Sequence, residues 1–505
     1  MKTIPLYLFS CLTLTSALRI PVTVERRAAP PSLGVSIKSL GLSSSSASSS
    51  SQPEIANVNN VLYATNITIG GQEITVQVDT GSSDLWVFSK TPLTGTTPAN
   101  ITGNLTYGVG SAAGPIEFAP FTMGSYSVAQ QAFINAATTT AFSENLFPIG
   151  VFGIMGLGFT VLNDISTINN RVAQAFNDDT LGQNPINNIF SQNTSTPNFI
   201  SVLLGRGDDL DGVTDGTFTV SEVIPGLENI TSTPQLARQG PGIGRWTVLL
   251  DGFSVNGKEI PLNSSVSGMP SGKSLAQLDT GATDAAIPPF MVTAIYSSMP
   301  GAIFSEGDNF WIVPCNSTAD VRFTFGGQEI AIHPLDLSGL LQIGFDSTTN
   351  LTVCTSNYQD GSALVGSDPE FDMNLGDVFL RNVYALFDYG TLGIQNNQQV
   401  VDDAFIQLLP RTDPQLALSD FTSSRSKQLS NSAPEATEDQ IKVVLSGNAT
   451  AAGTGVTTVT GTTPSSSPTS TSASKKSSST RSVVTAGWWS VMSLVGMAAF
   501  FSVVA

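Results

Sequence analysis

The stretch VQVDTGSSDLWVF, residues 76–88, places the tripeptide Asp79-Thr80-Gly81 between two short apolar runs. A second stretch, LAQLDTGATDAAI at residues 275–287, repeats this pattern around Asp279-Thr280-Gly281. The two copies lie 279 − 79 = 200 residues apart. A carboxylate presented by the same local frame in both halves of a chain predicts two similar lobes that meet at one site. Two carboxyl groups in contact can share a proton, which suits them to acid–base chemistry.

The composition excludes several other kinds of chemistry. The formal charge is −18, from 21 Lys and Arg against 39 Asp and Glu, and such a surface repels the phosphate backbone of nucleic acids. The chain has one histidine, His333, so a histidine-rich zinc site is excluded and a Ser-His-Asp mechanism would depend on this residue alone. Its apolar neighbours favour a structural or surface role. We therefore expect no metal and no cofactor.

The middle of the chain, from Val61 to Gln395, consists of short apolar or alternating runs broken by Gly, Asn, Asp and Pro. Gly70-Gly71 and Asn256-Gly257 separate such runs and predict hairpins. A helical pattern occurs in a few segments, at residues 168–176 and 289–296. The sequence therefore predicts a mostly β fold.

A second pair of segments repeats between the halves. Residues 152–158 follow the first Asp-Thr-Gly, residues 373–377 follow the second, and each contains an apolar pair near a glycine. We expect each lobe to place this later segment as a strand beside its aspartate loop.

The N-terminus is typical of a secreted protein. Residues 1–17 combine a basic start, a short apolar core and small residues, which predicts a signal peptide. Residues 18–60 are interpreted as a propeptide, with a candidate processing site at Arg26-Arg27. The serine run 43–51 has no apolar face to bury and is expected to be disordered.

The C-terminus has the composition of an attachment signal. Residues 447–482 are rich in Ser and Thr and predict an extended, O-glycosylated stalk, and residues 483–505 are apolar and uncharged. This order matches a GPI-attachment signal whose tail is removed, with Ser472 as the candidate attachment residue. A C-terminal membrane helix, or neither of the two, remains an alternative.

Cysteines and glycosylation sequons agree with passage through the secretory pathway. Cys11 lies in the leader, which leaves Cys315 and Cys354 as a pair. A disulfide between them would close a loop of roughly 40 residues and add about 4 kcal/mol in the chain-entropy model; two free thiols are the alternative. Nine Asn-x-Ser/Thr sequons are candidate N-glycosylation sites: Asn66, Asn100, Asn104, Asn193, Asn229, Asn263, Asn316, Asn350 and Asn448.

With these motifs in place, the chain resembles the pepsin-like aspartic proteases from about Val61 to Gln395. Residues 79–87 match the family's N-lobe signature almost fully, and LTYGVGS at 105–111 resembles the β-hairpin flap that closes over substrate. Residues 374–388 resemble the last core segment of the C-lobe, and the cysteine pair falls where the family has a C-lobe disulfide. Secretion, stalk and anchor signal resemble the fungal, GPI-anchored, yapsin-type branch.

The resemblance implies an architecture. It implies a bilobal fold with an N-terminal lobe at 61–225, a C-terminal lobe at 226–395 and the active site in the cleft between them. Residues 396–446 would form a segment after the catalytic domain. The protein would be a monomeric, glycosylated zymogen at the cell surface that hydrolyses protein or peptide bonds.

The resemblance also implies a role for each site residue. Asp79 and Asp279 would be catalytic. The residues that support the two aspartates would be Thr80, Gly81, Ser82, Thr280 and Gly281. The flap over the substrate would consist of Tyr107, Gly108, Val109 and Gly110. Trp86 would be the hydrogen-bond partner of the Tyr107 hydroxyl.

Two positions depart from the family pattern. Ala282 follows the second Asp-Thr-Gly where Thr or Ser is usual, so we expect Asp279 to lose a hydrogen bond, its pKa to rise, and the upper limit of activity to move toward neutral pH. Val109 offers no carboxylate in the flap, which argues against one route to cleavage beside lysine. Asp84 or Asp284 could still supply nearby charge. A catalytically weak surface-binding or wall-structural protein, or an adhesin that acts through its stalk, is the alternative function.

Overall fold

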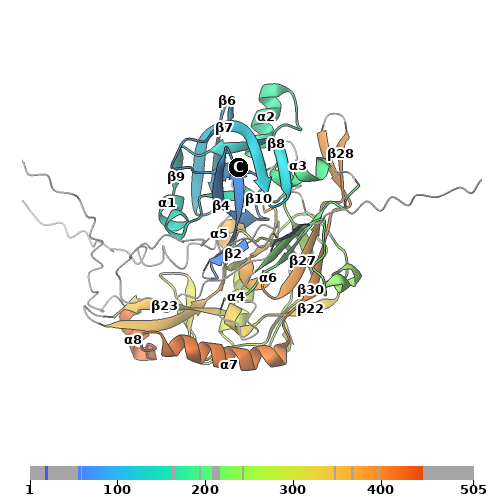
Figure 1. The fold of residues 1–505 in the computed structure, drawn as a ribbon. Coiled ribbons are helices and arrows are strands. Elements are labelled where there is room, and N and C mark those ends of the chain that lie inside the picture. Colours follow the sequence, from blue (N-terminus) through green and yellow to red (C-terminus); the bar gives the residue numbers. More distant parts are fainter. Residues whose placement is uncertain are drawn as a thin grey trace, which may run out of the picture.

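The computed structural model describes residues 18–20, 55–58, 60–160, 165–192, 195–207, 216–240, 244–345, 349–365, 369–395 and 398–446. Strands account for 40% and helices for 21%, and the strands form several sheets distributed over two β-rich lobes (Figure 1). The predicted fold class is therefore confirmed. Most of the predicted propeptide, the stalk with Ser472, and the apolar tail lie outside the described residues, as do Asn193 and Asn448.

The N-terminal lobe is built on one large sheet. Among the described residues its strand order is β2-β3-β4-β10-β5-β8-β7-β6, with β9 paired to β7. The predicted hairpin at Gly70-Gly71 joins β3 and β4, and both glycines have positive φ, 57° and 75°. The bounds are β2 Ile55–Val58, β3 Leu62–Ile69, β4 Gln72–Asp79, β5 Leu85–Val87, β6 Thr97–Tyr107, β7 Gly110–Met123, β8 Tyr126–Asn135, β9 Thr138–Thr140 and β10 Gly153–Gly156.

The C-terminal lobe contains three smaller sheets in the part of the chain that is described. Their orders are β14-β17-β26-β18-β25, β16-β15-β21-β22 and β19-β20-β24-β23. The predicted hairpin at Asn256-Gly257 joins β15 and β16. The bounds are β14 Thr247–Leu250, β15 Gly252–Val255, β16 Lys258–Glu259, β17 Ser274–Leu278, β18 Ala285–Ile287, β19 Ile303–Ser305, β20 Phe310–Val313, β21 Val321–Phe325, β22 Gln328–Ala331, β23 Ser338–Gly344, β24 Asn350–Ser356, β25 Tyr358–Asp360 and β26 Met373–Leu375.

A further sheet joins strands from both lobes in the order β1-β12-β11-β27-β30-β13. Its strand β30 begins at Phe405, so this sheet includes residues beyond Gln395, the expected end of the second lobe. A separate hairpin, β28 and β29, precedes β30. The bounds are β1 Leu18–Ile20, β11 Phe199–Leu203, β12 Thr217–Val220, β13 Leu236–Ala237, β27 Val383–Asp388, β28 Thr391–Gln395, β29 Gln398–Asp402 and β30 Phe405–Pro410.

The helices lie around these sheets. The two predicted helices are present as α2 and α4, and α7 runs along the base of the C-terminal lobe (Figure 1). None of the helices in the described ranges is both long and apolar enough to cross a bilayer. The bounds are α1 Phe142–Asn145, α2 Thr167–Phe176, α3 Pro185–Gln192, α4 Pro289–Tyr296, α5 Ser362–Val365, α6 Asp377–Leu380, α7 Pro414–Ser430 and α8 Glu438–Leu445, with 3-10 turns at Phe147–Ile149, Glu228–Ser232 and Pro334–Asp336.

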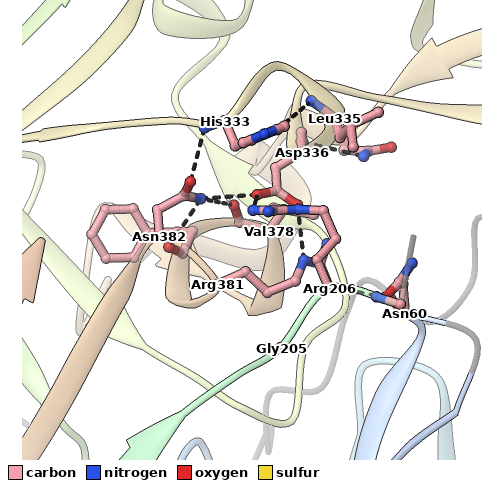
Figure 2. Close-up of polar contacts among 12 residues, drawn as sticks. Asn60, Gly205, Arg206, His333, Leu335, Asp336, Val378, Arg381 and Asn382 are labelled. Atoms are coloured by element: carbon pink, nitrogen blue, oxygen red, sulfur yellow. Dashed lines mark hydrogen bonds and ion pairs between the residues drawn. The ribbon is translucent and has the colours of Figure 1, made fainter. Parts of the chain in front are cut away.

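A buried ionic cluster connects the lobes on the side of Asn60 (Figure 2). Asp336 of the C-terminal lobe receives Arg206 of the N-terminal lobe at 2.5 Å and Arg381 at 2.8 Å, and Asn382 donates to it at 3.0 Å. Arg381 also donates to the backbone oxygen of Asn60 at 3.3 Å. The carboxylate of Asp336 thus faces two guanidinium groups, and both of its oxygens accept hydrogen bonds, as burial of a charge requires.

The predicted disulfide joins Cys315, just after β20, to Cys354 in β24. The guanidinium of Arg425 in α7 lies 3.3 Å from the sulfur of Cys354 and donates to the backbone oxygen of Ser338. His333 is buried, accepts a backbone N–H from Leu335 and pairs with Asp420 of α7 at 3.2 Å. These contacts attach α7 to the C-terminal lobe and agree with a structural histidine.

Candidate active site

The two Asp-Thr-Gly loops occupy the same structural frame. In the N-terminal lobe, β4 ends at Asp79 and pairs in parallel with β10, which also pairs antiparallel with β5 after the loop. In the C-terminal lobe, β17 runs directly into Asp279, and β26 pairs in parallel with β17 and antiparallel with β18. The later segments at 152–158 and 373–377 thus lie beside their loops, as the sequence predicts.

The two threonines connect the loops across the lobe boundary. The backbone N–H of Thr80 donates to the Thr280 hydroxyl at 3.1 Å, and the N–H of Thr280 donates to the Thr80 hydroxyl at 3.0 Å. Each hydroxyl donates onward to the opposite strand, to Leu278 at 2.9 Å and to Val78 at 2.8 Å. The predicted reciprocal bracing is present, and it fixes the two aspartates relative to each other.

The two glycines allow the carboxyl groups to approach. A Cβ at Gly81 would overlap the carboxyl of Asp279, and a Cβ at Gly281 would overlap that of Asp79. Each glycine also donates its N–H to Oδ1 of its own aspartate at 2.8 Å. Both aspartates are almost fully buried. The two carboxyl groups of Asp79 and Asp279 therefore form a close pair that the surrounding loops hold in place.

Burial and proximity raise the pKa of both carboxyl groups. Burial raises the pKa of Asp79, opposed by hydrogen bonds from Ser82 and Gly81. Burial and then the charge of Asp79 raise the pKa of Asp279 well above its usual range. The pair can therefore hold one proton while the other carboxyl is ionised.

The flap is the hairpin between β6 and β7. Tyr107 pairs with Gly110 across the turn formed by Gly108 and Val109. Burial raises the pKa of Tyr107 well above its usual range, and the contacts of its hydroxyl with Trp86 and Ser82 lower that pKa. The ring of Phe142 lies between the two aromatic residues, 5.5 Å from Tyr107 and 5.1 Å from Trp86 between ring centroids. The sequence analysis missed Phe142, which has no motif around it.

Two further polar residues at the site were also missed. The side chain of Gln77 donates to the backbone oxygen of Gly281 at 3.0 Å, and Asn374 of β26 donates to Oδ2 of Asp279 at 2.7 Å. The repeated Gln-x-Asp-Thr-Gly could have indicated Gln77, because a glutamine precedes the second loop as well. Asn374 lies 95 residues from Asp279, and no local signal connects them.

The expectation that Ala282 leaves Asp279 short of a hydrogen bond is wrong, because Asn374 supplies one. The pKa of Asp279 is raised, but Oδ2 of this carboxyl still accepts a hydrogen bond, from Asn374. Burial and the neighbouring Asp79 cause the rise, and Asn374 opposes it. Only the loop was considered in the sequence, whereas the donor comes from the adjacent strand.

The remaining candidates lie outside the site. Among the candidate glycosylation sites that the structure describes, Asn66 is half-buried and donates to Glu73, and the others are exposed. Asp84 is buried and accepts from the N-terminus of α2, at Thr167 and Ile168. No group of three or more His, Cys, Asp or Glu residues in the described ranges is arranged to hold a metal ion.

Comparison with known proteins identifies the family. The model of the eukaryotic aspartyl protease family matches residues 62–399. An aspartic protease of Phaffia rhodozyma is 30% identical over 65% of this chain and 74% of its own length. The aspartic-type endopeptidase ctsD of Aspergillus fumigatus is 26% identical over 65% of this chain and 63% of its own, and podosporapepsin of Podospora anserina is 29% identical over 65% and 71%.

The chain belongs to the eukaryotic aspartyl protease family. The predicted enzyme class, an aspartic-type endopeptidase, is confirmed by the family and by its relatives.

Proposed function

We propose that the protein is an endopeptidase in which Asp79 and Asp279 activate water for the hydrolysis of protein or peptide bonds. One observation carries the proposal: two buried carboxyl groups meet in matching loops, each loop packed against the other carboxyl through a glycine. Such a pair retains one proton over a wide pH range because ionising both groups side by side is unfavourable.

The chemistry divides between the two members of the pair. The ionised carboxylate takes a proton from water as general base, and the water oxygen attacks the carbonyl carbon of the substrate. The protonated carboxyl donates its proton to the carbonyl oxygen, which gives a neutral tetrahedral intermediate. Transfer of a proton to the amide nitrogen then allows the C–N bond to break. No metal or cofactor takes part in these steps.

The surroundings favour this reaction. Tyr107 on the flap would cover bound substrate and exclude bulk water.

We propose a location at the cell surface, as in the fungal, yapsin-type branch. The signal peptide at 1–17, the Ser/Thr-rich segment at 447–482 and the apolar tail at 483–505 support secretion followed by GPI anchoring at Ser472. Processing of residues 18–60 would release the active enzyme.

The test is hydrolysis of denatured haemoglobin between pH 3 and 6, with and without pepstatin. The wild-type protein is expected to be active and inhibited, and Asp79→Asn to lose about 10²–10⁴-fold because one member of the pair can no longer transfer a proton. Asp320→Asn, at an exposed carboxylate paired with Arg322, is the matched control and should retain activity. A correctly processed wild type without activity would favour a catalytically weak binding protein.

A further inference from the structure

The two catalytic carboxyl groups receive their second hydrogen bond from different places. In the N-terminal lobe, the hydroxyl of Ser82 donates to Oδ2 of Asp79 from within the loop. In the C-terminal lobe, the residue at the same loop position is Ala282, and the amide of Asn374 donates to Oδ2 of Asp279 from β26.

The strand register identifies the counterpart of Asn374. In the C-terminal lobe, Asn374 is paired with Gln277, two residues before Asp279. In the N-terminal lobe, the residue paired with Gln77, two residues before Asp79, is Ile154. In the N-terminal lobe the loop position is the donor Ser82 and the strand position is the apolar Ile154. In the C-terminal lobe the loop position is the apolar Ala282 and the strand position is the donor Asn374.

The side-chain nitrogen of Asn374 makes one hydrogen bond among the described residues, to Asp279. Asn374 is fully buried, and its partners across the sheet are the polar Gln277 on one side and Ala286 on the other. Its side-chain oxygen has no hydrogen-bond partner among the described residues. A buried amide whose oxygen accepts no hydrogen bond lowers the stability of the fold. The hydrogen bond to Asp279 therefore accounts for the presence of Asn374 better than packing does.

We propose that Asn374 is a positioning residue for Asp279, replacing from the neighbouring strand the hydroxyl that Ala282 lacks and keeping Oδ2 of Asp279 unprotonated. This inference rests on the proposed function. A hydroxyl can donate or accept, so Ser82 is compatible with either protonation state of Asp79. An amide N–H only donates, and an unprotonated carboxylate oxygen is the stronger acceptor, so this contact favours Oδ2 without a proton. The contact thereby favours a shared proton on one of the other three carboxyl oxygens.

The reverse orientation of the amide makes the opposite prediction. With Oδ1 of Asn374 facing Asp279, a proton on Oδ2 would be needed, and Asn374 would stabilise the protonated carboxyl. Removing the amide would then make Asp279 easier to ionise. The sign of the change in pH dependence therefore distinguishes the two arrangements.

The test is the pH profile of kcat/KM between pH 2 and 7 on a peptide substrate, for the wild type, Asn374→Leu, Ala282→Ser and the double variant. Asn374→Leu replaces the amide by an apolar side chain of similar branched shape. The acid limb is expected to move up by about one pH unit, so kcat/KM below that limb falls about tenfold, because the ionised pair loses a hydrogen bond. The double variant recreates the arrangement of the other lobe and should return the limb toward the wild-type position.

Other groups near the pair are the same in all variants. Asp377 of α6 and Tyr107 of the flap interact electrostatically with Asp279 and Asp79, respectively. Ile154→Leu is the matched control, since it changes packing beside Asp79 without removing a donor, and its acid limb should not move.

An acid limb that is unmoved or lowered in Asn374→Leu overturns the proposal, and a loss of thermal stability with an unmoved limb assigns Asn374 to packing alone. If Asn374→Leu does not fold, the double variant is compared with Ala282→Ser, and equal limbs overturn the proposal. A wild type without pepstatin-sensitive activity refutes the proposed function instead, which separates the two failures.

Discussion

Replacing Asp336 by asparagine is expected to destabilise the protein strongly, most of all above pH 5. Asp336 is 1% exposed and receives Arg206 from one lobe and Arg381 from the other (Figure 2). Asparagine occupies the same space but carries no charge, so both guanidinium groups would lose the carboxylate that they share. Removing one partner from a buried ion pair typically costs about 3–5 kcal/mol.

The pKa of Asp336 sets the pH range in which this contribution acts. Burial raises the pKa, but Arg206 and Arg381 outweigh burial and lower it from 3.8 to about 2. A lowered pKa in the folded state stabilises the fold above the unfolded value and loses this effect as the pH falls through the folded value. The shift corresponds to about 2 kcal/mol, lost between about pH 4 and pH 2.

The measurement is the free energy of unfolding in urea at several pH values from 2 to 6, followed by tryptophan fluorescence. The difference between wild type and Asp336→Asn should be large at pH 6 and smaller by about 2 kcal/mol at pH 2. Asp320→Asn removes an exposed carboxylate from an arginine and should change little at any pH. A difference that does not depend on pH would refute the electrostatic reasoning, and no difference at all would refute the role of the cluster.

Two further predictions concern stability. Burial raises the pKa of Asp84 to about 6 and that of Asp284 to about 7. Both carboxyl groups therefore stabilise the fold below pH 4 and lose this effect as the pH rises to 7. Thermal unfolding should show a lower Tm at pH 7 than at pH 4.5, and a Tm that does not depend on pH would contradict these assignments. Replacing Cys315 and Cys354 by serine should cost about 4 kcal/mol, measured by urea unfolding, because the disulfide closes a loop with a separation of 39 residues; an unchanged midpoint would show that α7 constrains this region without it.

The features that the sequence predicts well depend on residues close together in the chain. The glycines at 70 and 71 define a hairpin, and each Asp-Thr-Gly defines the loop that carries it. Helix α4 begins at a proline, Pro289, whose fixed φ suits the first turn. In each case the signal lies within about ten residues of the structure it specifies.

Helix α7 was missed although local signals for it exist. Asp413 caps the helix by accepting from Gln415 and Leu416, and Pro414 occupies the first turn. Helix α8 likewise begins with a capping box between Thr437 and Gln440. Residues 396–446 were interpreted only as a segment after the catalytic domain, whereas in the structure Asp420 and Arg425 attach α7 to the C-terminal lobe.

Asn374 illustrates a different limit, because no residue near it in the sequence indicates its contact with Asp279. Within Met-Asn-Leu-Gly, residues 373–376, the asparagine occupies the centre of a short buried strand, where an apolar residue would be expected. Its meaning depends on Ala282, which is distant in sequence and adjacent in space. Ala282 lacks the hydroxyl expected in the loop, and Asn374 is polar where an apolar residue is expected. Together the two residues preserve a hydrogen bond to Asp279. In both lobes a side chain donates to Oδ2 of the aspartate, from the loop at Ser82 in the N-terminal lobe and from the adjacent strand at Asn374 in the C-terminal lobe. Substitutions at the catalytic loops of this fold consequently have to be judged together with the strand beside them, since a missing hydroxyl in the loop does not imply a missing hydrogen bond.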